Sequence, residues 1–292
     1  YLDCPKQVVR LRLLNGSNAR IYNIGFSDQR NFYVIGGDGG LLEEPYLTNR
    51  ILLSNGERLE LLLDLTTDTL GASFFMQSFA SEMAANIPGA ITGMMGGNGP
   101  LEAVDFPILK LNVVPSTPNA VLTIPATLVA HTPWSIASAA RTRTRTISGM
   151  GMVSGQGNFF LDNMQYDHMV INDTMILGDI EVWNITNTSN MAHPMHIHDI
   201  QFYILSRNGI APAAFESGPK DVVLVRPGET VSLITRFEDF ADDTIPYMYH
   251  CHNLAHEDMG MMLQFIVTSP TSSVSSEVKE KYNVYPNPSS GY

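Results

Sequence analysis

The chain contains 292 residues, and its hydrophobic fraction of 44% supplies enough apolar side chains to pack two domains. Its net charge of -12 argues against a nucleic-acid-binding function, because such proteins need a basic surface. The sequence also lacks an apolar stretch of the length that a membrane-spanning helix requires.

The first predicted elements are β-strands. Val8 to Leu14 alternates in a strand pattern, and Arg20 to Phe26 follows as a second strand. Ile51 to Leu53 and Arg58 to Leu65 are two further strands. The residues between them, Ser54 to Glu57, contain Asn-Gly, which predicts that these two strands form a hairpin.

The middle and later parts of the chain continue this pattern. Residues 115–140 are rich in proline and predict an interdomain linker. Arg141 to Thr146 alternates arginine with threonine, which predicts a solvated edge strand that opens the next domain. Asp221 to Val225 and Glu229 to Phe237 flank Arg226-Pro227-Gly228 in another strand–turn–strand pattern.

Strands at this spacing predict an all-β chain built from antiparallel sandwiches. We divide it into a first domain at 1–114, a linker at 115–140, a second domain at 141–268, and a polar linker with a tail at 269–292.

The most informative segment is His250-Cys251-His252, followed by His256 and Met261. Successive side chains of a strand point to opposite faces, so the two flanking histidines project one way and the thiol the other. One short segment can therefore contribute ligands to two different metal sites.

A second cluster, from His193 to His198, complements the first. His196 and His198 share one face, while His193 faces the other way. Two ligand sets result: His193, Cys251, His256 and a weaker Met261; and His196, His198, His250 and His252. Two imidazoles, a thiolate and a thioether are the ligands of a blue-copper electron-transfer site, and the all-imidazole set suits further copper ions.

Each element alone has a simpler explanation. A His-x-His pair is usually a surface pair, and methionines near position 261 commonly fill cores. A structural zinc site usually contains two or more cysteines, whereas this set has one. Copper is favoured because six of the eight histidines fall in these two motifs.

At these residues the chain resembles the multicopper oxidases. The resemblance rests on HPMHIHDIQFYIL from His193 and YMYHCHNLAHEDMGMM from Tyr247, supported by ESGPKDVVLVRPGE, RLRLLNGSNAR and IGGDGGLLEEP, and it covers about residues 1–268. It is nearest to bacterial laccases, cuprous oxidases and bilirubin oxidases. It implies tandem cupredoxin-like sandwich domains with Greek-key topology.

The resemblance also implies a role for each ligand. Type 1 copper would bind His193, Cys251, His256 and Met261; type 2 copper would bind His196; and the type 3 pair would bind His198, His250 and His252. A reducing substrate would deliver electrons through His256 and Cys251, and dioxygen would be reduced to water.

Two acidic residues are further candidates. Glu257 resembles the proton-relay carboxylate of the family, although a solvated acid explains it about equally well. Asp221 is suited to orient a ligand imidazole, or it pairs only with Lys220.

The chain departs from the family in its histidine count. A trinuclear cluster needs eight imidazoles, four of them from an N-terminal domain, and only two His-x-His pairs are present here. His131 and His168 stand alone and are expected on the surface or in loops, and Cys4 is expected to be a small buried residue. We therefore expect a fragment with a complete type 1 set that cannot reduce oxygen alone and needs the N-terminal domain of the same polypeptide.

The expected activity is the oxidation of phenols, aromatic amines, bilirubin-like pigments or Cu(I), coupled to O2 reduction. The alternative is a non-enzymatic blue-copper electron carrier or copper-binding protein, which the intact all-imidazole set disfavours. Met83, Met94 and Met95 lie in a predicted flexible loop at residues 80–100; they suit Cu(I), but ordinary packing is favoured.

The tail predicts where the protein acts. Val284 to Gly291 resembles the opening of the C-terminal sorting domain of the type IX secretion system in Bacteroidetes. That resemblance implies a bacterial protein that is secreted, held at the cell surface or periplasmic. A Pro-Asn-Pro turn in a disordered tail is the alternative.

Overall fold

The computed structural model describes residues 1–91, 100–150 and 158–270, and nearly all regular elements in these ranges are strands, as the sequence predicts. The first half forms two sheets, with the strand orders β1-β9-β8-β3-β6 and β2-β7-β4-β5. Apolar side chains from both sheets, among them Phe26, Phe32 and Leu61, form one buried core. The elements are β1 (Leu2–Pro5), β2 (Val8–Leu14), β3 (Tyr22–Phe26), β4 (Phe32–Gly37), β5 (Gly40–Thr48), β6 (Ile51–Leu53), β7 (Arg58–Asp64), β8 (Ser73–Ser78), η1 (Ala80–Glu82) and β9 (Phe106–Val114).

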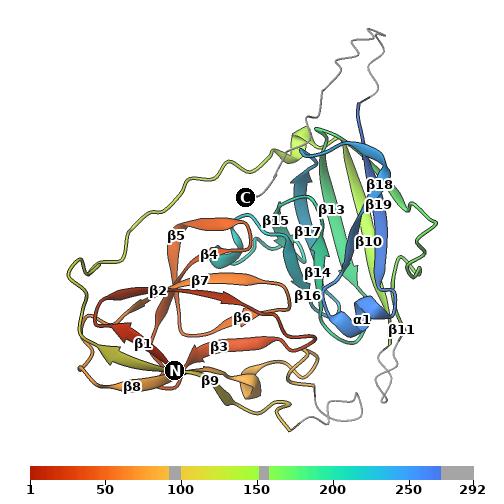
Figure 1. Cartoon of the computed structure of the whole chain (residues 1–292). Coiled ribbons are helices and arrows are strands. Elements are labelled where there is room, and N and C mark those ends of the chain that lie inside the picture. Colours follow the sequence, from red (N-terminus) through yellow and green to blue (C-terminus); the bar gives the residue numbers. More distant parts are fainter. Residues whose placement is uncertain (92–99, 151–157, 271–292) are drawn as a thin grey trace, which may run out of the picture.

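The second half repeats this architecture beside the first (Figure 1). Its sheets have the orders β11-β10-β13-β17-β15 and β12-β19-β18-β14-β16, and its core contains Trp183, Phe202 and Phe265. The elements are η3 (Ile136–Ser138), β10 (Arg141–Met150), β11 (Asn158–Leu161), β12 (Asp173–Ile176), β13 (Ile180–Asn187), β14 (His193–Ile197), β15 (Phe202–Arg207), η4 (Ala214–Glu216), β16 (Val222–Val225), β17 (Thr230–Arg236), β18 (Asp242–Cys251), α1 (Leu254–Asp258) and β19 (Met262–Thr268).

The two halves share one pattern of strand pairing. Ile24 on β3 lies opposite Ser78 on β8, and His196 on β14 lies opposite His250 on β18. His196 follows Ile24 by the same number of residues as His250 follows Ser78, and the β2–β7 and β13–β17 ladders repeat with the same spacing. The strands that carry the predicted metal ligands therefore have counterparts in the first half in which apolar or hydroxyl side chains occupy the ligand positions.

Two predicted turns connect different sheets. The strands on either side of Ser54 to Glu57 are present, but β6 pairs with β3, whereas β7 pairs with β2 and β4, so the predicted hairpin is wrong. The turn itself forms, because the Glu57 N–H donates to the Ser54 carbonyl at 3.0 Å and Gly56 has a φ of 80°. The later turn, in which the Glu229 N–H donates to the Arg226 carbonyl at 3.0 Å, connects β16 to β17 across sheets in the same way. Asn-Gly and Pro-Gly favour a chain reversal, but the sheet that each strand joins depends on distant partners.

The strand predicted at Arg141 to Thr146 is the first part of β10, and along this part it pairs only with β13. Arg141 is 41% exposed, as predicted, but Arg143 and Arg145 are not solvated, which corrects the prediction for these two arginines. The Arg143 side chain is 13% exposed and contacts Glu181 at 2.6 Å and Asp173 at 2.8 Å. Arg145, 12% exposed, contacts Asp173 at 2.6 Å. The acidic partners lie on β12 and β13, so the local sequence does not reveal them.

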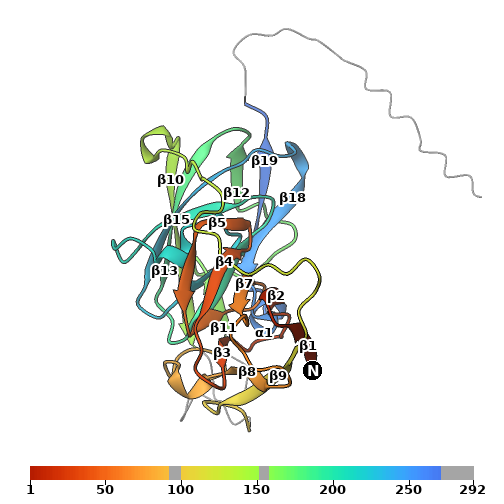
Figure 2. The ribbon, with the colours of Figure 1, turned by 90° about the vertical axis from the view of Figure 1, so that its left-hand side faces the viewer.

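Residues 115–140 contain no strand and pass from the first half to the second (Figure 1). This segment contacts β2 and β5, since the Val8 N–H donates to the Val121 carbonyl and the Leu128 N–H donates to the Glu43 carbonyl, both at 2.8 Å. Helix α1 lies next to the first half in both ribbon views (Figures 1 and 2), and the Leu254 N–H donates to the Asn18 carbonyl at 2.8 Å. Among the described residues, no helix combines the length and apolar character needed to cross a bilayer.

Candidate metal centres

Three buried side chains form the first ligand group, which we define as His193, Cys251 and His256. His193 begins β14, Cys251 ends β18, and His256 lies in α1. The Cys251 Sγ lies 3.6 Å from Nδ1 of His193 and 3.4 Å from Nδ1 of His256, and these two nitrogens are 3.2 Å apart. The three atoms converge closely enough for one metal ion to contact all of them.

A short turn before β14 orients His193. The Ser189 hydroxyl lies 2.9 Å from Nε2 of His193, and the Asn187 side-chain oxygen accepts the Ser189 N–H at 2.9 Å. Because Nε2 is engaged by Ser189, Nδ1 is the ring nitrogen that faces Cys251. Sequence reasoning missed Ser189, although a run of short polar residues at 187–190, shortly before the histidine motif, was the available clue.

Burial makes the first ligand group neutral when no cation is bound. It raises the pKa of the Cys251 thiol to about 12 and lowers the pKa of His256 to about 4. The pKa of His193 is lowered well below its usual value by burial and by the nearby His256. A bound metal cation would reverse this preference, because it stabilises the thiolate that coordinates it.

Two apolar residues enclose the first ligand group. Met261 is fully buried, and its backbone bonds to both ligand segments: the Cys251 N–H donates to its carbonyl at 3.1 Å, and its N–H donates to the His256 carbonyl at 2.9 Å. Phe159 on β11, which sequence reasoning missed, packs against both imidazoles, with centroid distances of 4.7 Å to His193 and 4.4 Å to His256. No local pattern in the sequence indicated this contact.

The second ligand group, His196, His198 and His250, lies on the opposite face of the same two strands. The Nε2 atoms of His198 and His250 are 3.1 Å apart, and one ligand nitrogen from each of the three rings fits within the span of a metal site. The rings of His196 and His198 are 4.9 Å apart between centroids. Burial lowers the pKa of both His198 and His250 to about 4, so these imidazoles are also neutral.

His252, the fourth imidazole of the predicted set, lies beside this group. Its ring centroid is 5.5 Å from that of His250 and 5.8 Å from that of His196. It rests against Gly56 of the first half, where an added Cβ would come within 2.5 Å of the imidazole Cδ2. Sequence analysis identified Gly56 only as a turn residue. The structure shows that the absence of a side chain at Gly56 also leaves space for the His252 ring.

The acidic candidates both contact histidines of this group. Glu257 Oε2 lies 3.3 Å from Nδ1 of His250. Asp221 accepts a hydrogen bond from Nδ1 of His196 through its backbone carbonyl, at 2.7 Å, rather than through its carboxylate. The predicted alternative, a pair between Asp221 and Lys220, is wrong: Asp221 pairs with Arg58.

The other candidates lie away from both groups. Cys4 is buried in β1, as expected. His131 is a half-buried loop residue that contacts the Leu41 carbonyl at 2.7 Å, while His168 is 78% exposed. Met83 packs in an apolar cluster with Ile21, which favours the packing interpretation. Met94 and Met95, and the residues from 271 onward that include the tail motif, lie outside the described residues.

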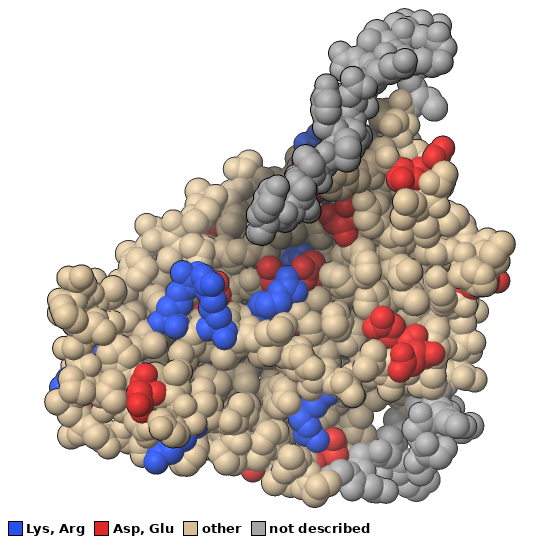
Figure 3. All heavy atoms as spheres, viewed as in Figure 1, with Lys and Arg blue, Asp and Glu red and all other residues tan. Residues whose placement is uncertain are grey.

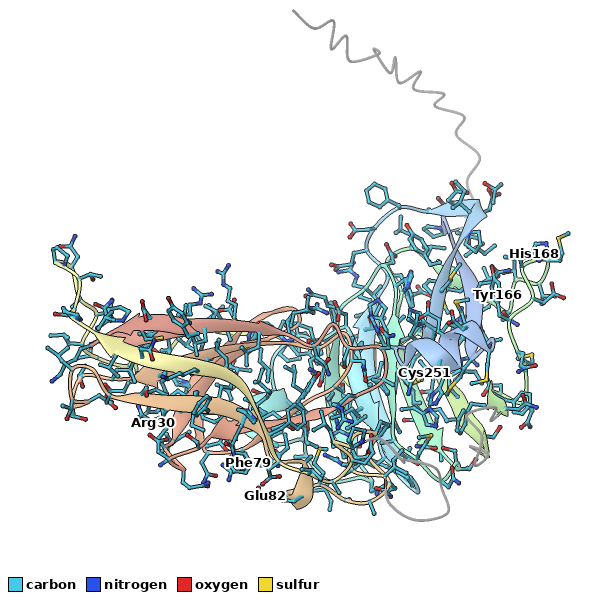
Figure 4. The ribbon with its side chains drawn as sticks, turned by 60° about the horizontal axis from the view of Figure 1, so that its bottom comes forward. Arg30, Phe79, Glu82, Tyr166, His168 and Cys251 are labelled. Carbon is cyan, nitrogen blue, oxygen red and sulfur yellow. The ribbon has the colours of Figure 1, made fainter. Side chains whose placement is uncertain are left out.

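Figure 4 places Cys251 inside the second half, with Tyr166 and His168 on a loop at its outer edge and Phe79 in the first half. Phe79 follows Ser78 as Cys251 follows His250, so it is the counterpart of the thiol. The Arg50 guanidinium stacks on the Phe79 ring at 3.2 Å. Among the described residues, both possible metal-ligand groups belong to the second half.

The geometry and fold agree with comparisons to known proteins. Residues 135–271 match the family model for multicopper oxidase. The multicopper oxidase mco of Staphylococcus haemolyticus is 30% identical over 92% of this chain and 50% of its own length, and the laccase of Bacillus subtilis is 27% identical over 92% and 53%. The crystal structure of a multi-copper oxidase from Pediococcus acidilactici superposes with a TM-score of 0.76 at 30% identity, over 94% of this chain and 52% of that one.

The fold is the tandem cupredoxin-like sandwich that the sequence predicts. The chain belongs to the multicopper oxidase family, whose name implies copper as the metal. It spans about half the length of the curated relatives it matches.

Proposed function

We propose that this chain is the electron-accepting part of a multicopper oxidase. His193, Cys251 and His256, with Met261 as a weak fourth ligand, would hold type 1 copper. His196, His198, His250 and His252 would supply ligands to a type 2 and type 3 copper cluster. The observation that supports this most strongly is the convergence of two neutral imidazole nitrogens on one buried thiol, with His250, next to that thiol in sequence, belonging to a second imidazole group.

The donor set fits copper better than zinc. Structural zinc sites are usually closed by four ligands with several cysteines, whereas the first ligand group has a single thiol and two imidazoles. Two imidazoles and a thiolate with a distant thioether are the ligands of blue-copper sites. The buried, apolar surroundings, with Phe159 over both rings, would exclude water from the ion.

Bound copper would supply one-electron redox chemistry, taking electrons from a reducing substrate and passing them to dioxygen, which is reduced to water. The protein's part is to hold the donors. Ser189 fixes the His193 ring, and Cys251 joins the two ligand groups through its own backbone. Glu257, at 3.3 Å from Nδ1 of His250, is placed to hold a proton at the edge of the second group.

We propose phenols, aromatic amines, bilirubin-like pigments or Cu(I) as reducing substrates of the whole protein. The alternative is an electron carrier or copper-binding protein without oxidase activity. The gathering of His196, His198 and His250 into one group disfavours it, because a carrier has no use for a second metal group. The net charge of -12 disfavours nucleic acid as a partner. On the face drawn in Figure 3, acidic side chains lie beside the basic ones in the centre and without them on the right.

We also propose that the cupredoxin-like domains span 1–114 and 141–268 with the linker at 115–140, and that four further imidazoles come from another part of the same polypeptide. The support is the number of histidines, since the second set offers four of the eight ligands that the family's trinuclear cluster requires. The sorting-domain motif near the end supports action in the bacterial periplasm, at the cell surface or outside the cell.

The decisive experiment is a copper count combined with an absorption spectrum of the copper-loaded chain. We expect an intense visible band from thiolate-to-copper charge transfer that is absent in Cys251→Ser. The matched control is Cys4→Ser, which removes the other buried thiol and should keep the band. A band that persists in Cys251→Ser, or is equally lost in Cys4→Ser, would contradict the assignment.

Oxidase activity is tested separately on the full-length polypeptide. Substrate-dependent oxygen uptake that disappears in His250→Gln supports the oxidase. A full-length protein that holds the visible band but consumes no oxygen with any of the four substrate classes would favour the electron carrier.

A further inference from the structure

The second ligand group is anchored to the first half of the chain by an ion pair that crosses between the halves. Arg58 begins β7, and its guanidinium binds both carboxylate oxygens of Asp221, with Nη1 at 2.8 Å from Oδ1 and Nη2 at 2.5 Å from Oδ2. Such a bidentate pair fixes the relative orientation of the guanidinium and the carboxylate as well as their distance, because both groups are planar.

Asp221 is also the residue that holds the His196 ring. Its carbonyl accepts the hydrogen bond from Nδ1 of His196 at 2.7 Å, and the same carbonyl accepts the Ile197 N–H at 3.3 Å. A carbonyl only accepts hydrogen bonds, so it holds the proton on Nδ1 and leaves Nε2 unprotonated. The ring is thereby prepared to offer Nε2 as a ligand.

Arg58 is itself held rigidly. Its Nη1 donates to the Gly56 carbonyl at 2.8 Å, its Nη2 donates to the Asp38 carbonyl at 3.0 Å, and its N–H donates to Asp38 Oδ1 at 2.8 Å. The neighbour of Asp221 is fixed in the same place, since the buried Lys220 ammonium contacts Asp38 at 2.9 Å and Glu57 at 3.0 Å. The segment before β16 therefore has charged contacts to the first half at two successive residues.

We propose that Arg58 is a positioning residue for the second ligand group: acting through Asp221, it holds His196 in the tautomer and orientation that coordinate a metal. The inference extends the proposed function, since it takes His196 as a ligand. The described residues of the first half contain no possible metal-ligand group. The first half nevertheless determines the geometry of the metal site in the second half.

The test uses the metal-free, nitrogen-15-labelled chain at pH 8. Imidazole nitrogen shifts report which ring nitrogen of His196 carries the proton. We expect a single tautomer protonated on Nδ1 in the unchanged chain and a mixture of tautomers in Arg58→Met. Zn²⁺ then serves as a diamagnetic probe, and its half-saturation concentration, followed at the His196 signals, should rise by about 10-fold or more, as is typical when a ligand loses its supporting partner.

The controls separate positioning from general damage. Arg10→Met removes another arginine that pairs with a carboxylate, that of Glu60, in the same sheet, and it should leave the His196 signals unchanged. Arg58→Lys keeps the charge but loses the bidentate geometry, so it should shift the His196 tautomer ratio in the same direction as Arg58→Met. It provides the test if Arg58→Met does not fold. Asp221→Asn should reproduce the effect, and the double variant Arg58→Met with Asp221→Asn should add little to either single change.

Unchanged His196 tautomers and Zn²⁺ half-saturation in Arg58→Lys and Asp221→Asn would overturn the proposal. Additive effects in the double variant would show that Arg58 does not act through Asp221 and would also overturn it. The thiolate-to-copper band is a separate measurement: its absence from the unchanged chain would contradict the type 1 assignment and leave the His196 result standing.

Discussion

Cys251 and His250 are neighbours on β18, yet their side chains belong to different ligand groups. The Cys251 Sγ lies 3.4 Å from Nδ1 of His256, whereas Nε2 of His250 lies 3.1 Å from Nε2 of His198. A single peptide unit therefore joins the two groups, and a change at either residue should affect one group without removing the other.

The contact between Gly56 and His252 predicts a difference between two matched glycines. Gly56 and Gly228 occupy equivalent cross-sheet turns with φ of 80° and 71°, but a Cβ at Gly228 would meet nothing within 4 Å. Gly228→Ala should cost about 1–2 kcal/mol of unfolding free energy from the left-handed backbone alone. Gly56→Ala should cost more and should also shift the His252 imidazole signals in an NMR spectrum. Equal costs with an unchanged His252 spectrum would contradict the close contact between Gly56 and the His252 ring.

The burial of Phe159 against the first ligand group predicts a large loss of stability when its ring is removed. This ring is 2% exposed, so Phe159→Ala should lower the unfolding free energy by about 3–5 kcal/mol in a denaturant titration. Phe240→Ala is the matched control, because Phe240 is 79% exposed and its truncation should change stability by no more than about 0.5 kcal/mol. A loss below about 1 kcal/mol for Phe159→Ala would contradict the packing described here.

Met261 predicts a change in redox behaviour with little change in stability. Met261→Leu conserves volume in a fully buried position, so the metal-free chain should lose less than about 1.5 kcal/mol. The visible copper band should persist, while the reduction potential should rise because a thioether donor to the oxidised ion is lost. Redox titration of the band measures this. An unchanged or lower potential would argue that Met261 is core packing alone.

The buried imidazoles predict acid sensitivity of the metal-free chain. In the folded chain the pKa of His250 and His256 is about 4, below the value of about 6.5 expected in the unfolded chain. The unfolded chain therefore binds protons first as the pH falls, so the stability these neutral rings contribute is present above about pH 6.5 and is lost progressively toward pH 4. Each histidine contributes a slope of at most about 1.4 kcal/mol per pH unit.

Urea unfolding at pH values from 8 to 5 measures this slope. His250→Gln should reduce it, whereas His168→Gln, at a 78% exposed position, should not. A stability that does not change between pH 7 and pH 5 would contradict the burial of these rings.

The strands and the division of ligands between two faces were predictable from the sequence, because side-chain alternation in a strand is a local property. His193 and Cys251 fall on one face and His196 and His250 on the other, as that alternation requires. The cross-sheet connections were not predictable. A turn such as Asn55-Gly56 specifies a reversal of the chain but not which sheet the next strand joins.

Contacts between distant segments could also not be predicted from the sequence. Asp221 was identified as a possible support for an imidazole, but its bond uses the backbone carbonyl, which is the same in every residue type. Arg58 was identified only as a strand residue, because its partner lies in the other half of the chain. Such roles depend on how the two sandwiches dock rather than on any local pattern.

The repeated strand pairing has a consequence for metal loading. In the first half, Ile24 and Ser78 occupy the positions of His196 and His250 and the strands pair in the same register, so this framework assembles without ligand side chains. The pairing of β14 with β18 therefore does not require an ion to draw the strands together. We expect copper to enter an already folded scaffold, so that uptake is limited by access through the protein rather than by folding of the chain.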